Sequence, residues 1–331
     1  MELHALGQTG LRVSRLGLGL AALGRPGYIT LGRARDLGAD RGPDAMYARA
    51  ATVLDAARAA GIRYVDAARS YGQAEAFLAR WLAEHGVEPH EMVVGSKWGY
   101  RYTAGWAVDA PVHEEKELSL DRFRLQLGES RVLLDDRVAL YQIHSATLDS
   151  GVFRNDALMA ALVDARRKGT VRALGFTLSG PESAAALEQA LAVSVDGERV
   201  FDVVQATFNV LEPSLAASLA AAHDAGIGVM VKEVHANGRL TDSNDRPEDA
   251  GLLGELRRIG GGRPSDQLAV AFALSHPFVD VVLSGAATPA QLTSHVAAVE
   301  TPLDPATRDA LGAVPEPPTT YWRIRGSLPW S

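Results

Sequence analysis

Short runs of β-branched and aliphatic residues alternate along the chain with longer Ala- and Leu-rich segments, in which apolar residues recur every three to four positions. The short runs are typical of buried strands, and the longer segments are typical of helices. The runs lie at residues 13–18, 62–66, 92–97, 138–144, 171–177, 200–207, 227–232 and 279–283. Strands that alternate with helices favour a parallel sheet, and eight strands predict a closed (β/α)8 TIM barrel.

Glycine marks the boundaries of the predicted elements. Gly61-Ile62 and Gly226-Ile227 repeat one arrangement, in which a helix ends and a strand begins. At the start of the chain, Leu3–Leu6 and Leu11–Val13 flank the sequence Gly7-Gln-Thr-Gly10. This pattern predicts an N-terminal β-hairpin that plugs the bottom of the barrel.

Three segments are longer than a minimal barrel needs: Arg25–Ala45, Trp98–Ser119 and the tail from Pro315 to Ser331. Long loops inside a compact domain tend to carry function. The first two follow predicted strands and are therefore expected at the catalytic rim. We expect residues 314–331 to fold over the same rim, so that residues 1–331 form a single barrel domain.

Composition and charge exclude several classes of protein. Hydrophobic residues make up 47% of the 331 positions, which is enough for one large core. A net charge of −7 offers no electrostatic footprint for nucleic acid or an anionic membrane. The chain has no cysteine, no charged leader followed by an apolar run, and no apolar stretch of about 18 residues. We expect a cytoplasmic protein with neither a nucleic-acid partner nor a membrane partner.

Four polar residues lie where successive strands should end or pass into a helix: Asp66, Tyr71, Lys97 and His144. In a parallel barrel such strand ends converge on one rim, which is the rim that carries chemistry. Each residue alone has a structural explanation, such as a helix cap or a satisfied core histidine. Because all four follow neighbouring strands, the set predicts a proton-donor site for carbonyl reduction.

A cation beside Tyr71 is what this chemistry requires, since a free phenol has a pKa near 10. A lysine about 4 Å away interacts with a phenolate by roughly 4 kcal/mol at an effective dielectric near 20, or about three pK units. Burial acts in the opposite direction. We therefore expect Lys97 to lower the pKa of Tyr71, Asp66 to keep Lys97 charged, and His144 either to orient the carbonyl or to relay a proton.

Several motifs together resemble the aldo-keto reductase superfamily over nearly the whole chain. They are Gly61-Ile-Arg-Tyr-Val-Asp-Ala-Ala-Arg-Ser-Tyr-Gly72, the Lys97 strand, Gln142-Ile-His144, Gly175-Phe-Thr177 and Val204-Gln-Ala-Thr-Phe-Asn209. That family is a TIM barrel that uses a nicotinamide cofactor without a Rossmann domain. The resemblance implies that Asp66, Tyr71, Lys97 and His144 are its catalytic tetrad, with Tyr71 as proton donor.

The resemblance also assigns residues to the nicotinamide end of the cofactor. Gln205 matches the glutamine that binds the carboxamide. Thr177 and Leu178 stand where the family usually has Ser-Asn, so one amide contact is missing. Lys232 stands where an aromatic residue often stacks on the nicotinamide ring, which leaves Lys232 to meet either cofactor phosphate or substrate.

The adenosine end matches residues 283–292, which include Gly285, Thr288 and Gln291. A helix N-terminus there would offer free N–H groups to an anion. The family often places an arginine in this segment for a 2′-phosphate, whereas this chain has Ala287 and Thr288, and His295 replaces a frequent asparagine. NADP(H) is favoured over NAD(H) only because the family usually uses NADP(H).

Aromatic side chains from the rim segments are candidates for the substrate pocket. We expect Tyr28, Trp98 and Trp322 or Trp330 to form the walls above the nicotinamide, since aromatic rings give shape and apolar contact at low entropic cost. No metal is expected, because His113-Glu-Glu-Lys-Glu lacks a second histidine four residues on.

The sequence thus predicts an NAD(P)(H)-dependent oxidoreductase that reduces a small aldehyde, ketone or sugar-like carbonyl to an alcohol. Two alternatives remain open. One is an NAD-dependent sugar dehydrogenase that works in the oxidative direction. The other is a barrel that has kept the fold but serves as a non-catalytic binding subunit. The predicted partner is a small carbonyl substrate, and the sequence does not give the oligomeric state.

Overall fold

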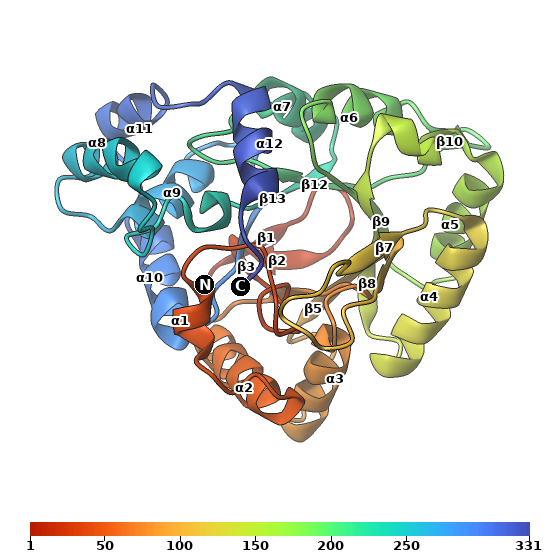
Figure 1. The fold of residues 1–331 in the computed structure, drawn as a ribbon. Helices are drawn as coiled ribbons and strands as arrows, with labels where there is room; N and C mark the ends of the chain where they lie inside the picture. The colour runs from red at the N-terminus through yellow and green to blue at the C-terminus, as the bar shows by residue number, and fades with distance from the viewer.

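Eight parallel strands form a closed barrel in the computed structural model, which describes all of residues 1–331 (Figure 1). In order around the barrel they are β3 (Leu16–Gly19), β4 (Tyr64–Asp66), β5 (Val93–Trp98), β8 (Val138–Ala146), β9 (Ala173–Leu178), β12 (Val203–Thr207), β13 (Gly228–Lys232) and β14 (Val281–Ser284). Strand β14 pairs with β3 and closes the ring. The predicted TIM barrel is confirmed.

Helices surround the barrel, and the main core lies between them and the strands (Figure 1). The helices are α1 (Arg33–Leu37), α2 (Pro43–Ala59), α3 (Ala74–Glu84), α4 (Leu120–Leu133), α5 (Asp156–Arg167), α6 (Ser183–Leu191), α7 (Ala216–Asp224), α8 (Ala250–Gly260), α9 (Ser265–Leu274), α10 (Pro289–Glu300), α11 (Pro305–Leu311) and α12 (Pro318–Ser327). Single turns of 3-10 helix span Leu148–Ser150, Val152–Arg154, Ala236–Gly238 and Pro247–Asp249. None of the helices combines the length and the apolar character needed to cross a bilayer.

The predicted N-terminal hairpin is present and consists of β1 (Leu3–Ala5) paired with β2 (Arg12–Ser14). Its buried side chains Leu6, Leu11 and Val13 pack with inward-facing barrel residues in a second apolar cluster. The hairpin turn also donates a backbone hydrogen bond from Gln8 to the loop before β13. The hairpin therefore closes the bottom of the barrel.

The first barrel strand is shorter than the predicted run of residues 13–18. Val13 and Ser14 belong to the hairpin, and the barrel strand begins at Leu16. The Ser14 hydroxyl donates to the carbonyl of Leu16 and accepts from the N–H of Arg63, so it fixes the point at which the chain leaves one sheet for the other. The apolar pattern continues across this change of sheet and does not reveal it.

The three long segments are all ordered, and they gather at the top of the barrel. Residues 25–45 contain α1 and the start of α2, and residues 98–119 contain the hairpin β6 (Tyr100–Tyr102) and β7 (Glu114–Lys116). A second small hairpin joins β10 (Ser194–Val195) to β11 (Glu198–Arg199). Helix α12 lies across the barrel in Figure 1, and Ile29 forms an antiparallel bridge with Trp330 of the tail.

The hairpin plug generates a stability prediction with a built-in control. Gly7 and Gly10 both have positive φ, but a Cβ on Gly7 would collide with the backbone of Gly228, whereas a Cβ on Gly10 would meet nothing within 4 Å. Gly10→Ala should lower the free energy of unfolding by about 1–2 kcal/mol, because alanine is strained in the left-handed backbone conformation. Gly7→Ala should cost about 2 kcal/mol more, because the plug must shift. Urea unfolding of the two variants measures this difference, and equal losses would contradict the proposed close contact.

Candidate active site

An ion pair between Asp66 and Lys97 lies inside the barrel, where β4 and β5 run side by side. The Lys97 ammonium donates to Asp66 Oδ2 and to the carbonyl of Ala67 at 3.0 Å, and it lies 3.4 Å from the Tyr71 hydroxyl. The two charged side chains are only 0% and 3% exposed. Because a buried charge needs a partner, the geometry fixes both groups beside the hydroxyl of Tyr71.

The second oxygen of Asp66 is held by neutral donors. Its Oδ1 accepts from Tyr64 Oη at 3.0 Å, from Gln142 Nε2 at 3.1 Å and from Gln205 Nε2 at 3.3 Å. Tyr64 lies on β4 with Asp66, Gln142 lies on β8 and Gln205 lies on β12. The floor of the site is therefore one polar network with Asp66 at its centre.

Tyr71 lies in the turn between β4 and α3, and it is 9% exposed. Gly72 next to it has φ 61°, and a Cβ there would lie 2.5 Å from the carbonyl of Gly24, so this turn requires glycine. Burial raises the pKa of Tyr71 well above its usual value, Asp66 raises it further, and Arg25 lowers it. The prediction that Lys97 lowers the pKa of Tyr71 is therefore wrong. Asp66 neutralises the Lys97 ammonium, and burial of the phenol raises its pKa.

Arg25 is a cation beside Tyr71 that sequence reasoning missed. Its guanidinium lies 5.2 Å from the ring centre of Tyr71 and 5.1 Å from those of Tyr28 and Trp330. It donates to the carbonyl of Ser70 at 3.1 Å and pairs with Glu114. The segment Arg25–Ala45 was expected at the rim, but no periodic signal distinguishes this arginine from the others in the segment.

His144 stands beside the phenol of Tyr71. Its ring packs edge-on against Tyr71 at 5.5 Å and against Tyr100 at 5.0 Å, and its Nδ1 lies 3.4 Å from Ser70 Oγ. Burial lowers the pKa of His144 well below its usual value, and the neighbouring cations, with Lys97 first, lower it further. His144 is therefore neutral at neutral pH, and it can donate a ring N–H without adding charge.

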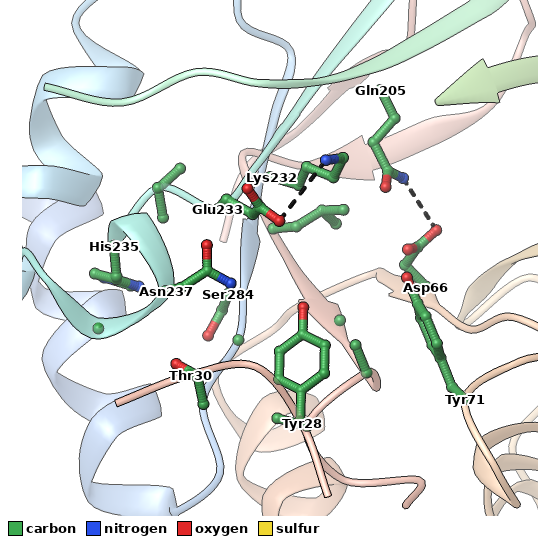
Figure 2. A pocket seen from close by; sticks show the side chains of 17 residues that line it. Tyr28, Thr30, Asp66, Tyr71, Gln205, Lys232, Glu233, His235, Asn237 and Ser284 are labelled. Carbon is green, nitrogen blue, oxygen red and sulfur yellow. Dashed lines mark hydrogen bonds and ion pairs between the residues drawn. The ribbon is translucent and has the colours of Figure 1, made fainter. Parts of the chain in front are cut away.

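A cleft of about 690 Å³ opens above this floor (Figure 2). Among the residues proposed from sequence, its lining includes Asp66, Tyr71, Gln205, Lys232, Gly285 and Tyr28. In Figure 2, Asp66 and Tyr71 lie at one side, His235 lies at the other, and the ring of Tyr28 stands between them. We call this cleft the first cavity.

A second cavity of about 760 Å³ adjoins the first one. The two share the lining residues Ala22, Thr30, His235, Gly238 and Gly285. The second cavity extends to Gln291 in the first turn of α10 and to His295 in the middle of that helix. Together the two cavities form a continuous groove that runs from the polar floor to α10.

The upper wall of the first cavity carries a buried charged cluster. Lys232 Nζ donates to Thr207 Oγ1 at 2.9 Å and to Ser179 Oγ at 3.2 Å, and it lies 4.0 Å from Glu233. Arg325 from the tail helix α12 binds Glu233 at 2.7 Å. The cluster ties the tail to the end of β13 and leaves one more cation than anion at the mouth.

The titration of this cluster follows from its burial and its pairing. Burial alone would raise the pKa of Glu233, but Arg325 and Lys232 lower it to about 2. Burial lowers the pKa of Lys232 to about 8, partly offset by Glu233. Glu233 also has φ 55°, a left-handed backbone that costs energy and tends to be kept at functional sites.

The α10 end of the groove differs from the sequence expectation of free N–H groups. Ser284 Oγ accepts from the N–H of Ala286, Gln291 Oε1 accepts from that of Ala287, and Thr288 Oγ1 accepts from that of Gln291. These side chains therefore occupy three of the N–H groups at and just before the start of α10. Thr288 is the N-cap of α10 and does not line the cavity.

Thr177 also has a structural contact that was not expected. Its hydroxyl accepts from the N–H of Ser145 at 2.7 Å, and Ser145 has φ 51° directly after His144. Thr177 is fully buried and does not line either cavity. Its position suits it to hold the turn that orients His144.

The aromatic wall is only partly as expected. Tyr28 lines the first cavity, and Trp330 packs on it at 6.3 Å while stacking on His113 at 3.8 Å. The expectation for two residues is corrected: Trp98 is fully buried against Phe123 of α4, and Trp322 packs on Tyr321 in the core. Neighbouring strand residues face opposite ways, so Trp98 points outward because Lys97 points inward.

Comparisons with known proteins agree with the fold. The model of the aldo/keto reductase family matches residues 15–314. An uncharacterised oxidoreductase of Bacillus subtilis, YrpG, is 27% identical over 92% of this chain and 93% of its own length. The holo form of aldo-keto reductase AKR11C1 from Bacillus halodurans superposes with a TM-score of 0.74 at 24% identity, covering 96% and 97% of the two chains. A putative aldo-keto reductase from Pseudomonas aeruginosa gives 0.65 at 22% identity, with coverage of 93% and 95%.

The Glu233–Arg325 pair predicts a pH-dependent contribution to stability. Arg325→Met leaves Glu233 buried with a weaker partner, so the free energy of unfolding at pH 7 should fall by about 3 kcal/mol. Because the folded-state pKa of Glu233 is depressed, its contribution is present above about pH 4.5 and is lost as the pH falls toward 2. The gap between wild type and variant should therefore narrow on acidification.

Urea unfolding from pH 7 downward measures this gap. Arg323→Met, on the exposed face of the same helix, is the matched control and should change stability by less than about 0.5 kcal/mol. A gap that stays constant with pH would show that Arg325 acts through packing alone.

Proposed function

The chain belongs to the aldo/keto reductase family of oxidoreductases, and we propose that it reduces a small aldehyde, ketone or sugar-like carbonyl to an alcohol with a nicotinamide dinucleotide. The observation that carries this proposal is the hydroxyl of Tyr71 held beside the buried Asp66–Lys97 pair at the end of a long groove. Such an arrangement suits a proton donor for a bound carbonyl oxygen.

The groove has features that fit a dinucleotide. Gly285 lies where the two cavities meet, and a Cβ there would meet nothing within 4 Å, so a ligand can approach the backbone closely. Asn237 Oδ1 and His235 Nε2 are buried without partners, and both side chains line the groove. Buried polar atoms are usually hydrogen-bonded, so these two atoms are candidates for hydrogen bonds to a ligand. Gln205 and Lys232 both line the first cavity. Gln205 would bind the carboxamide of the cofactor, and Lys232 would meet a polar group of cofactor or substrate.

The cofactor would supply or accept the hydride when bound. In the direction of reduction, Tyr71 gives the proton that the carbonyl oxygen takes up as the C–H bond forms. Its raised pKa keeps the proton on the phenol at neutral pH until negative charge develops on that oxygen. Neutral His144 can donate a hydrogen bond to the same oxygen, and the cations at the mouth favour the developing charge.

Two alternatives differ from this proposal in direction and in class. A sugar dehydrogenase would use the same groups in reverse, with Tyr71 accepting a proton, and the polar lining by Lys232, Glu233 and Asn237 suits a substrate with several hydroxyl groups. A non-catalytic binding subunit is disfavoured, because the buried tetrad would then keep a costly ion pair without use. Turnover of a nicotinamide cofactor with a panel of aldehydes and aldoses separates the three.

The choice between the two nicotinamide cofactors is a separate question. The family's habit favours NADP(H). The residues at the α10 end of the groove bear on this choice directly.

Tyr71→Phe tests the proton donor. The variant should lower kcat by about 10²–10⁴, as expected for loss of general acid catalysis, while the Kd for the cofactor stays nearly unchanged. Tyr47→Phe removes a hydroxyl far from the groove, on α2, and should leave kcat within about twofold of wild type. A Tyr71→Phe enzyme within tenfold of wild type would refute the assignment.

Lys97→Met combined with Tyr71→Phe tests whether the buried groups act as a unit. Since Lys97 and Asp66 position the hydroxyl of Tyr71, the double variant should be little worse in kcat than the worse single variant. Steady-state kinetics of the four proteins measure the coupling. Losses that simply multiply would mean that the two residues contribute independently.

A further inference from the structure

The second cavity carries carboxylates and almost no available positive charge. Asp36, Asp242 and Asp266 line it, and Arg33 is the only arginine or lysine that does so. The carboxylates do not converge as a group that could hold a metal ion. The charged side chains that line this end of the groove are therefore mostly acidic.

Arg33 cannot offer its charge to a ligand in this structure. It is 1% exposed, and its guanidinium donates to the backbone carbonyls of Ala22, Arg25, Pro26 and Ser331. Burial lowers its pKa to about 9, which still leaves it charged at neutral pH. Its N–H donors are therefore used by backbone carbonyls and are not available to a phosphate. Arg33 instead holds the rim segments together.

The two histidines of this cavity are neutral at neutral pH. His235 and His295 stack at 4.3 Å, and burial lowers the pKa of each. His295 Nδ1 is hydrogen-bonded to Ser284 Oγ at 2.8 Å. The histidines can therefore serve as flat, uncharged surfaces, but they do not supply a cation for an anionic ligand.

Other sources of positive charge are also absent from the wall. Three N–H groups at and just before the start of α10, those of Ala286, Ala287 and Gln291, are bound to the side chains of Ser284, Gln291 and Thr288. Arg35 lies outside the lining; it is 60% exposed, donates to the carbonyl of Ser243 at 2.5 Å and lies 3.8 Å from Asp245. Within the cavity, Asp36 instead accepts from Gln291 Nε2 at 2.9 Å.

We propose that the second cavity binds an adenosine ribose with free hydroxyl groups and rejects a 2′-phosphate, so that the protein prefers NAD(H) to NADP(H), with Asp36 as the specificity-determining residue. A carboxylate accepts hydrogen bonds from hydroxyl groups but repels a phosphate dianion. This inference rests on the proposed function, and it reverses the preference that the family's habit suggested. The absence of an arginine at Ala287 and Thr288 agrees with it.

The test compares ligands that differ only in the 2′-phosphate. The Kd values of NADH and NADPH, and of 5′-AMP and adenosine 2′,5′-bisphosphate, are measured by calorimetry on the whole protein without substrate. We expect each phosphorylated ligand to bind at least about tenfold more weakly, with a smaller ratio at high salt because salt screens like-charge repulsion. Asp36→Asn, which keeps the shape and removes the charge, should reduce the ratio by about threefold or more.

Matched variants sharpen the result. Arg35→Gln removes an exposed cation that lies outside the lining and should leave the ratio unchanged. Ala287→Arg should instead shift the ratio toward the phosphorylated ligands by adding a charge-assisted contact. Equal or tighter binding of NADPH by wild type would overturn the inference while leaving the proposed function intact. If Asp36→Asn left the ratio of Kd values unchanged, Asp36 would not be the residue that determines cofactor specificity. Failure of all four ligands to bind at millimolar concentration would overturn the proposed function, and this inference with it.

Discussion

The buried ion pair between Asp66 and Lys97 is the interaction on which the rest of the site depends. Removing two charges from water costs several kcal/mol for each ion, and their attraction offsets this only when the remaining hydrogen bonds are also made. Here those bonds come from Tyr64, Gln142 and Gln205, so residues of four different strands converge on one carboxylate. A shift in the register of β4, β5, β8 or β12 would break these contacts with Asp66, so the carboxylate helps to fix the register of the four strands.

The rim segments depend on one another in a similar way. Arg33 binds carbonyls of the first long segment and of the C-terminal residue Ser331, while Ile29 pairs with Trp330. Arg325 reaches from α12 to Glu233 at the end of β13. The rim is therefore held together by contacts between parts of the chain about 300 residues apart.

Much of this organisation could be predicted from sequence, and the failures have physical causes. Strand periodicity gives the barrel, and the ends of parallel strands must converge, so Asp66, Lys97 and His144 could be placed together in advance. Periodicity also explains why Trp98 had to point away from the cavity, a consequence that follows from Lys97 pointing inward. Contacts made by rim loops, such as those of Arg25, carry no periodic signal and could not be derived.

The α10 end shows a second limit of sequence reasoning. A helix N-terminus is a ready anion site only when its N–H groups are free. Here the side chains of Ser284, Gln291 and Thr288 bind three N–H groups at and just before the start of α10. Whether a side chain folds back on its own helix or faces a ligand depends on local geometry, which sequence pattern does not give. The same holds for Asp36, whose place in the second cavity follows from the path of a long loop.

Protonation states at the Tyr71 end of the groove follow from the same balance of burial and charge. Tyr71 keeps its proton because it is buried beside Asp66, and His144 stays neutral because it is buried among cations. At neutral pH the site therefore holds one phenol proton next to a paired lysine, together with an uncharged imidazole. A site in that state can give a proton to an oxygen that becomes negative, and the excess positive charge at the mouth favours that change. The opposite charge at the α10 end favours a ligand that brings hydroxyl groups there, so the groove distinguishes its two ends by charge as well as by shape.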